Sequence, residues 1–104
     1  MIHLPIEKYT VKIPGHKEVT TLTFLKDCIL NPPEKGFSYD DLKTRERIES
    51  IIDKTQEDKK AIVVKFETND GNNVKEIVKS MLWTLYHKDI IHFVDSIEEM
   101  KEEK

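Results

Sequence analysis

Apolar and polar positions alternate near the N-terminus and predict a β-hairpin. Three apolar residues alternate with three polar ones between residues 6 and 13: Tyr9, Val11 and Ile13 against Lys8, Thr10 and Lys12. This is the period of a half-buried strand. Pro14-Gly15-His16-Lys17 favours a turn, and a second short strand near 18–22 would complete a hairpin over residues 6–22. The run Thr20–Thr23 also allows a helix to begin there.

Helical spacing follows in two segments separated by prolines. Apolar residues predict a helix over residues 22–30, and Asn31-Pro32-Pro33 ends it, because proline disfavours helical geometry in the residue before it. Ser38 then predicts the N-cap of a second helix that runs over 39–54, with aspartates in its first turn. Thr55 to Lys60 reads as a polar loop.

The second half of the chain predicts one strand and two helices. Ala61 to Glu67 has strand alternation, and Asn69-Asp70-Gly71-Asn72 is typical of a turn. A third helix from Asn73, closed by His87-Lys88, would place six apolar residues on one face: Val74, Ile77, Val78, Met81, Leu82 and Leu85. Asp89 would cap a fourth helix whose inner face is Ile90, Phe93, Val94 and Ile97.

Together these elements predict an α+β fold. We expect a small antiparallel sheet, the N-terminal hairpin plus strand 61–67, packed against three or four helices. The 104 residues match one domain, 1–104, and the acidic tail 98–104 is expected to fray into solvent.

Composition and charge narrow the classes of partner. The chain is 38% hydrophobic and 36% charged, with a net charge of −3, so it can fold but lacks the clustered positive charge that nucleic-acid binding needs. The N-terminus has no signal-peptide pattern, and no apolar run approaches the roughly 18 residues of a membrane span. We therefore expect a cytoplasmic protein that binds neither membranes nor, in general, nucleic acid.

The residues that carry chemistry are too scattered to predict a catalytic site. Cys28 is the only cysteine and falls on the apolar side of a helix, which favours a buried, inert thiol. The four histidines, at positions 3, 16, 87 and 92, show no metal-ligand spacing. The three glycines stand alone, so no phosphate loop is present. We predict no enzyme activity, no catalytic residue, no metal and no cofactor.

Four residues break the local pattern and are candidates for interaction. Arg45 lies on the apolar arc of helix 39–54, where it either extends to water along its stem or meets a partner's carboxylate. Trp83 falls on the outward side of the third helix, to be covered by the fourth helix or by another chain. Phe37 and Tyr39 flank the Ser38 cap, and Phe37 can also staple the start of the helix.

Several segments together resemble small phage- or prophage-encoded proteins of about this length, found among virion-assembly genes. The segments are Thr23-Phe24-Leu25, Asn31-Pro32-Pro33-Glu34-Lys35-Gly36-Phe37, Arg45-Glu46-Arg47-Ile48, Trp83 and Ile91-His92-Phe93-Val94. The resemblance implies an assembly or accessory role and the cytoplasm of a host cell. It implies no catalytic residue, cofactor or ligand.

The expected function is therefore a non-enzymatic protein-interaction module. Its partner would be another protein or a second copy of this chain, with a homodimer formed through Trp83 as the form of self-association. The alternative is a small nucleic-acid-associated regulator that uses helix 39–54, which carries Lys43, Arg45, Arg47 and Lys54. Four acidic residues on the same helix count against this alternative: Asp40, Asp41, Glu46 and Glu49.

Overall fold

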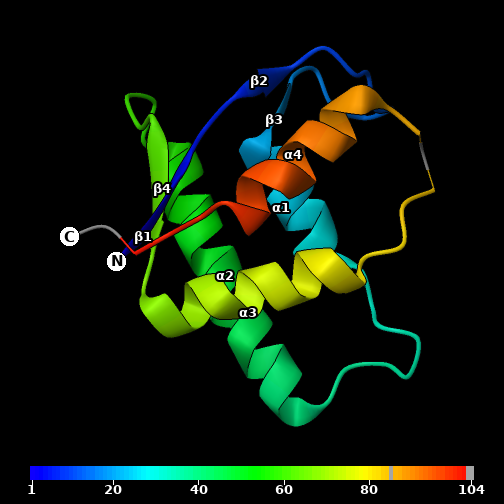
Figure 1. Cartoon of the computed structure of the whole chain (residues 1–104), viewed down its shortest axis with the longest axis vertical. Coiled ribbons are helices and arrows are strands. Elements are labelled where there is room, and N and C mark those ends of the chain that lie inside the picture. Colours follow the sequence, from blue (N-terminus) through cyan, green and yellow to red (C-terminus); the bar gives the residue numbers. More distant parts are fainter. Residues whose placement is uncertain (85, 103–104) are drawn as a thin grey trace.

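Four helices and two small antiparallel sheets make up the fold, which confirms the predicted α+β class. The computed structural model describes residues 1–84 and 86–102. Within these ranges the elements are β1 (Ile2–Pro5), β2 (Lys8–Tyr9), β3 (Val19–Thr20), α1 (Thr21–Leu30), α2 (Tyr39–Glu57), β4 (Val63–Phe66), α3 (Thr68–Ser80) and α4 (Lys88–Glu98). Figure 1 shows their arrangement.

The main sheet joins the start of the chain to its middle. β1 pairs with β4 in antiparallel register, with Ile2 opposite Phe66 and Leu4 opposite Val64. All four of these side chains are buried, so the sheet contributes one apolar face to the core. The strand predicted at 61–67 is confirmed over 63–66, but its partner is residues 2–5. The predicted hairpin is in a separate sheet.

The hairpin itself is shorter than predicted. Only Lys8–Tyr9 and Val19–Thr20 pair, and residues 10–18 form the connection between them. Gly15 has a φ of 89° in this connection, a conformation that other residues adopt only with strain. Thr20 ends β3 and also caps α1, so both interpretations of the Thr20–Thr23 run are realised at one residue.

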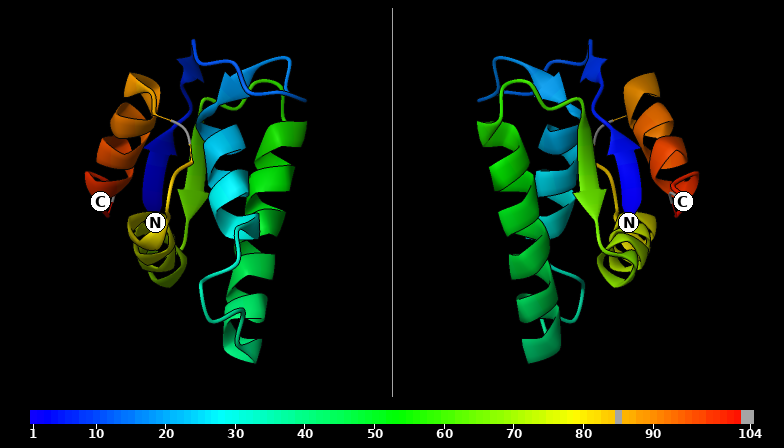
Figure 2. Two further views of the ribbon diagram at one scale, coloured as in Figure 1. Left: turned by 90° about the vertical axis from the view of Figure 1, so that its right-hand side faces the viewer. Right: turned by 90° about the vertical axis from the view of Figure 1, so that its left-hand side faces the viewer.

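Ser38 caps α2, as the sequence predicted. Ser38 accepts a hydrogen bond from the backbone N–H of Asp41 and begins α2. The helix continues through Glu57, so the polar loop predicted from Thr55 begins three residues later. Only Ile48 and Ile52 of α2 are buried, and its N-terminal part projects beyond the other helices, as Figures 1 and 2 show.

α3 begins at Thr68, so the predicted turn at residues 69–72 is wrong. Gly71 is helical and has no positive φ. A Cβ atom at Gly71 would lie 2.5 Å from the Cδ1 atom of Ile2. The absence of a side chain at Gly71 therefore allows α3 to pack closely on β1, and the residue does not form a turn.

α3 ends at Ser80, earlier than predicted, so Trp83 is not on a helix. The backbone at Met81 is extended, Leu82 is exposed, and Leu85 lies outside the described residues. His87 does not close α3; it caps α4 by accepting a hydrogen bond from the N–H of Asp89. The prediction that Asp89 is the cap is therefore wrong.

The described part of the C-terminal tail packs against the fold, in contrast to the fraying predicted for residues 98–104. Met100 is buried, and its carbonyl accepts a hydrogen bond from Lys75. Glu102 pairs with Ile2 in an isolated β-bridge and accepts a hydrogen bond from the Thr68 hydroxyl. Residues 103 and 104 lie outside the described residues.

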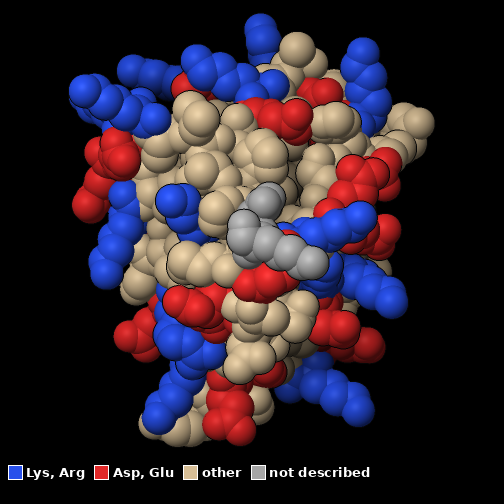
Figure 3. All heavy atoms as spheres, turned by 60° about the vertical axis from the view of Figure 1, so that its left-hand side comes forward, with Lys and Arg blue, Asp and Glu red and all other residues tan. Residues whose placement is uncertain are grey.

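The elements surround one cluster of buried apolar residues. In both views of Figure 2, β1 and β4 lie between α4 on one side and α1 and α2 on the other. Figure 3 shows one face of the surface, where basic and acidic side chains are interspersed around an uncharged area. Among the described residues, no helix combines the length and the hydropathy that crossing a membrane requires.

Candidate functional site

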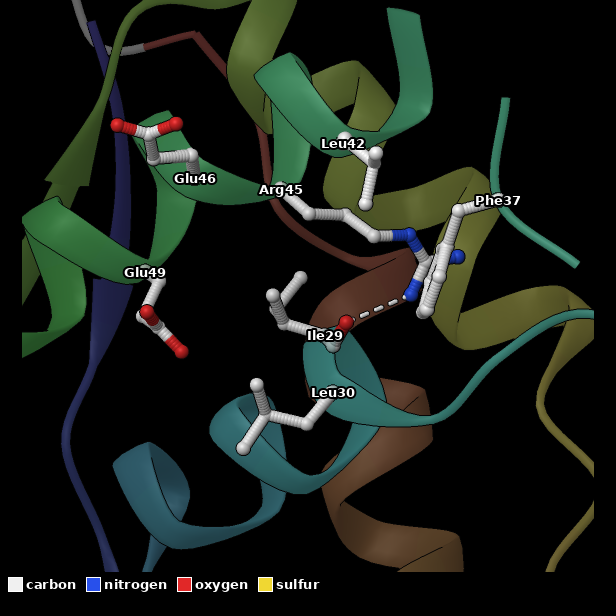
Figure 4. A pocket seen from close by; sticks show the side chains of 7 residues that line it. All are labelled: Ile29, Leu30, Phe37, Leu42, Arg45, Glu46 and Glu49. Carbon is white, nitrogen blue, oxygen red and sulfur yellow. Dashed lines mark hydrogen bonds between the residues drawn. The ribbon is translucent and has the colours of Figure 1, made fainter. Parts of the chain in front are cut away.

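Three exposed apolar side chains line a hollow where the C-terminal end of α1 meets α2. We call this hollow the α1–α2 pocket. It has a volume of about 430 Å³ and is lined by Ile29, Leu30, Phe37, Leu42, Arg45, Glu46 and Glu49. Figure 4 shows the leucine from each helix facing the hollow, with Phe37 at one end and the two glutamates at the other. The pocket thus has an apolar centre and an acidic end.

The apolar lining is unusually accessible. Leu30 is 56% exposed, Leu42 is 51% exposed and Phe37 is 37% exposed. Leu42 lies on the same apolar arc of α2 as Ile48 and Ile52, but only the two isoleucines are buried. The N-terminal part of α2 projects beyond the other helices. Helical spacing shows which residues share a face, but it does not show how much of that face is covered.

Arg45 holds the two helices together at this pocket. Its Nη1 group donates hydrogen bonds to the carbonyl oxygens of Cys28, Ile29 and Asn31, at 3.2, 2.8 and 3.2 Å. Helix C-termini leave carbonyl groups without partners inside the helix, and the arginine satisfies them here. Neither prediction for Arg45, a head group in water or one on a partner's carboxylate, describes this arrangement.

Phe37 and Tyr39 differ in their relation to the pocket. The Phe37 ring lies under the guanidinium of Arg45, with its centroid 4.9 Å from Cζ, a geometry that favours cation–π attraction. Tyr39 is exposed, and the Nζ atom of Lys43 lies over its ring, 4.8 Å from the ring centroid. The structure therefore brings Arg45 and Phe37 together, and Tyr39 lies close in sequence without lining the pocket.

The lining of the pocket carries a net negative charge, because it contains two glutamates and one arginine. The charge of Arg45 faces backbone carbonyls, and burial is the main cause that lowers its pKa. Neither Glu46 nor Glu49 forms an ion pair within the described part of the chain. An incoming basic group would therefore meet two free carboxylates.

Trp83 lies away from this pocket. Its ring makes edge-to-face contacts with Phe24 and Phe93, at centroid distances of 5.9 and 6.1 Å. Since Phe93 is on α4, the fourth helix supplies part of the cover that the sequence left open. The geometric argument for a homodimer through Trp83 loses its basis, while the homodimer itself stays a prediction.

Nucleophiles and titratable groups elsewhere form no accessible catalytic arrangement in the ranges described. Cys28 is 1% exposed, and burial raises the pKa of its thiol to about 12, with Asp27 adding to the shift. Glu7 contacts His92 at 2.8 Å, but the nearby Thr21 hydroxyl is buried and accepts a hydrogen bond from the Glu7 N–H. No group of three potential metal ligands converges among the described side chains.

No family model, no curated protein and no solved structure matches this chain. The resemblance to phage-encoded proteins therefore stays a prediction, and the function has to be argued from the geometry above.

Proposed function

We propose that this chain is a non-enzymatic protein-interaction module and that the α1–α2 pocket is its docking surface. The observation that carries the proposal is the exposure of Leu30, Phe37 and Leu42 around one preformed hollow. Clustered exposed apolar side chains with a polar border are typical of interaction sites. A single exposed leucine would need no such explanation.

The pocket is already formed in the chain by itself. Arg45, in the second turn of α2, donates hydrogen bonds to the carbonyls of Cys28 and Ile29 near the C-terminal end of α1, and a capping box at Ser38 begins α2. A docking surface that is already formed costs less conformational entropy when the partner binds. The Arg45–Phe37 contact therefore has a structural part in the proposal, and the two leucines provide the contact area.

The occupant that fits this surface is a segment of another protein with an apolar side chain next to Lys or Arg. The apolar side chain would lie between Leu30 and Leu42. The basic group would lie near Glu46 and Glu49, which have no ion pair among the described residues. Complementary charge sets specificity and association rate more than affinity, and the net charge of −3 favours the same partner.

An assembly or accessory role of phage type is the most specific form of this proposal. It rests on the sequence resemblance alone. A docking module without chemistry of its own is compatible with such a role, and the pocket contributes only the recognition step.

The nucleic-acid alternative has less support from the geometry. Of the four basic residues on α2, Arg45 is bound to carbonyls, Arg47 pairs with Asp70 at 3.0 Å, and Lys43 lies over Tyr39. Figure 3 shows basic side chains along one edge of the face drawn, and basic and acidic side chains interspersed over the rest. Phosphate binding would have to displace contacts that already satisfy these side chains.

Selection from a random peptide library displayed on a carrier tests the proposal. We expect peptides enriched on the wild-type chain to contain an apolar residue beside Lys or Arg. They should lose binding to Leu42→Glu, which places a charge in the apolar centre. Lys54→Glu, on the same helix but outside this pocket, is the matched control and should keep them. Enrichment without such a motif, or binding unaffected by Leu42→Glu, contradicts the proposal.

A further inference from the structure

A second pocket of about 410 Å³ lies under Trp83, apart from the docking surface. Its lining combines α1, α4, the connection after α3 and the loop between β2 and β3. Most of the lining is apolar or aromatic: Ile13, Pro14, Phe24, Met81, Trp83 and Ile90. Its polar members are Lys12, Asp27 and Thr84. A mainly apolar lining with a few polar groups is typical of small-molecule sites.

The aromatic wall of this pocket is fixed in position. Trp83 meets Phe24 at an interplanar angle of 88° and Phe93 at 79°. Such edge-to-face contacts are favourable arrangements of aromatic rings. They hold the indole in place while leaving it only partly buried, so part of the ring is free to contact a ligand.

Asp27 supplies the one carboxylate of this lining, which also holds Lys12 and Thr84. Its carboxylate makes no hydrogen bond or ion pair with the described side chains or backbone. Burial raises its pKa, and the charge of His16 works in the opposite direction. A carboxylate beside apolar groups gains most from a positively charged ligand, because desolvation has already weakened its interaction with water.

We propose that this pocket binds a small apolar amine, with its hydrocarbon or aromatic part against Trp83 and Phe24 and its ammonium group at Asp27. Aromatic rings also attract cations through their faces. The other charged groups near the carboxylate are Lys12, which lines the pocket, and His16. Both are exposed. The site shares no residue with the α1–α2 pocket, so it stands or fails independently of the docking proposal.

Phenethylamine is a suitable probe, with 2-phenylethanol and 3-phenylpropionate as its neutral and anionic counterparts. Trp83 is the only tryptophan, so its fluorescence reports binding at the pocket directly. We expect saturable binding of the amine with a Kd of about 1 mM or below. The alcohol should bind about tenfold more weakly, because it lacks the charge-assisted contact, and the anion should bind weakest.

Asp27→Asn should reduce amine affinity to that of the alcohol. Asp40→Asn, an exposed position on α2, is the matched control and should leave the affinity unchanged. Equal affinities for the amine and the alcohol, an unchanged amine affinity in Asp27→Asn, or no saturable amine binding would overturn the proposal.

A measurement on the unmodified chain covers the case in which Asp27→Asn does not fold. Amine affinity should fall as the pH is lowered and Asp27 takes up a proton, while alcohol affinity should stay constant. An amine affinity with the same pH profile as that of the alcohol would also overturn the proposal.

Discussion

At the scale of single residues, Arg45 has a structural role that its position on the apolar arc of a helix did not predict. One guanidinium satisfies three carbonyl groups at the end of α1 and also lies over Phe37. A lysine could supply only a point charge in its place, because it lacks the planar fork of donors. The residue stabilises the fold and shapes the docking surface at the same time.

Removing Arg45 should therefore destabilise the chain. Arg45→Ala leaves the carbonyls of buried Cys28 and Ile29 without their side-chain donor, and we expect a loss of about 1–3 kcal/mol in the free energy of unfolding. Urea denaturation followed by circular dichroism measures this. Lys54→Ala on the same helix should change stability by no more than about 0.5 kcal/mol. Equal effects of the two substitutions would refute the capping role.

Cys28 should be chemically inert in the folded protein. It is buried and the pKa of its thiol is raised to about 12, so the reactive thiolate is nearly absent at neutral pH. Ellman's reagent should label the native chain slowly and label it completely after denaturation in guanidinium. Rapid labelling under native conditions would show that the thiol is accessible and would reopen a nucleophilic role.

At the scale of elements, features that depend on neighbouring residues could be predicted from the sequence, and the pairing of strands far apart in the chain could not. Caps at Ser38 and the proline pair after α1 are read from a few neighbouring residues, and both helices were predicted close to their observed bounds. β1 was missed because its only apolar residues in Ile2–Pro5 are Ile2 and Leu4 beside a proline, and its partner β4 lies far along the chain. The alternation of Ile2 and Leu4 with His3 was a local signal, but it is short and ends at a proline.

The differences around α3 have the same origin. Asn69-Asp70-Gly71-Asn72 has turn chemistry, but packing against Ile2 keeps it helical. At the other end, apolar spacing continues through Leu82, yet the chain becomes extended at Met81 and Trp83 contacts Phe24 and Phe93. In both places tertiary contacts override local preference.

The site could be predicted from the sequence only in part, for a related reason. Arg45 and Phe37 each break a local pattern, so both were candidates. Leu42 fits the apolar arc of its helix and looked like a core residue, whereas Leu30 lies off the arc of Leu22, Leu25, Cys28 and Ile29 and was not considered as a site residue. The exposure of Leu30 and Leu42 depends on how far α2 projects beyond the core, which spacing along one helix does not encode.

Gly71 should be intolerant of even a methyl group. In an open helix, Gly→Ala stabilises by about 1 kcal/mol, but here the new Cβ would meet Ile2 at 2.5 Å. We expect Gly71→Ala to lower the free energy of unfolding by about 1–3 kcal/mol. Asn72→Ala, exposed on the same helix, should not destabilise.

A double variant identifies the cause of this loss. Ile2→Val removes the Cδ1 atom that makes the closest contact, so adding it to Gly71→Ala should recover part of the stability. If the two substitutions are simply additive, the clash is not the reason for the loss, and the close approach of α3 and β1 is not as described.

The junction between α4 and the N-terminal segment should respond to acid. Asp89 accepts hydrogen bonds from the N–H groups of Thr10 and Val11, at 2.8 and 3.0 Å, and from the Thr10 hydroxyl. Desolvation opposes ionisation, but these bonds and His87 together lower the pKa of Asp89. A lowered folded-state pKa stabilises above the ordinary value for Asp, and this contribution is lost as the pH falls through the folded-state pKa.

Urea midpoints measured from neutral pH down to about pH 3 test this junction. Below about pH 4 the wild type should lose stability faster than Asp89→Asn, which has no charge to lose there. Asp95→Asn, exposed on the same helix, should follow the wild-type profile. Parallel profiles for wild type and Asp89→Asn would mean that Asp89 does not hold residues 10 and 11 in solution.

At the scale of the whole molecule, two separate hollows carry different chemistry. The α1–α2 pocket is bordered by acidic residues, and the pocket under Trp83 encloses one carboxylate in aromatic surroundings. The molecule measures 35 × 34 × 24 Å, and the N-terminal part of α2, which contributes Leu42 to the first pocket, projects beyond the other helices in Figure 1. Recognition of a protein segment at that pocket is the central claim.

Chemical-shift mapping with matched short peptides tests this claim most directly. The blocked tripeptides Lys-Phe-Lys and Glu-Phe-Glu offer the same apolar side chain with opposite flanking charge. We predict that the basic peptide shifts the backbone amide signals of Leu30, Phe37 and Leu42, with saturation, and that the acidic peptide does so far more weakly. Shifts confined to other residues, or equal responses to both peptides, would contradict the α1–α2 pocket as a docking surface for a basic, apolar segment.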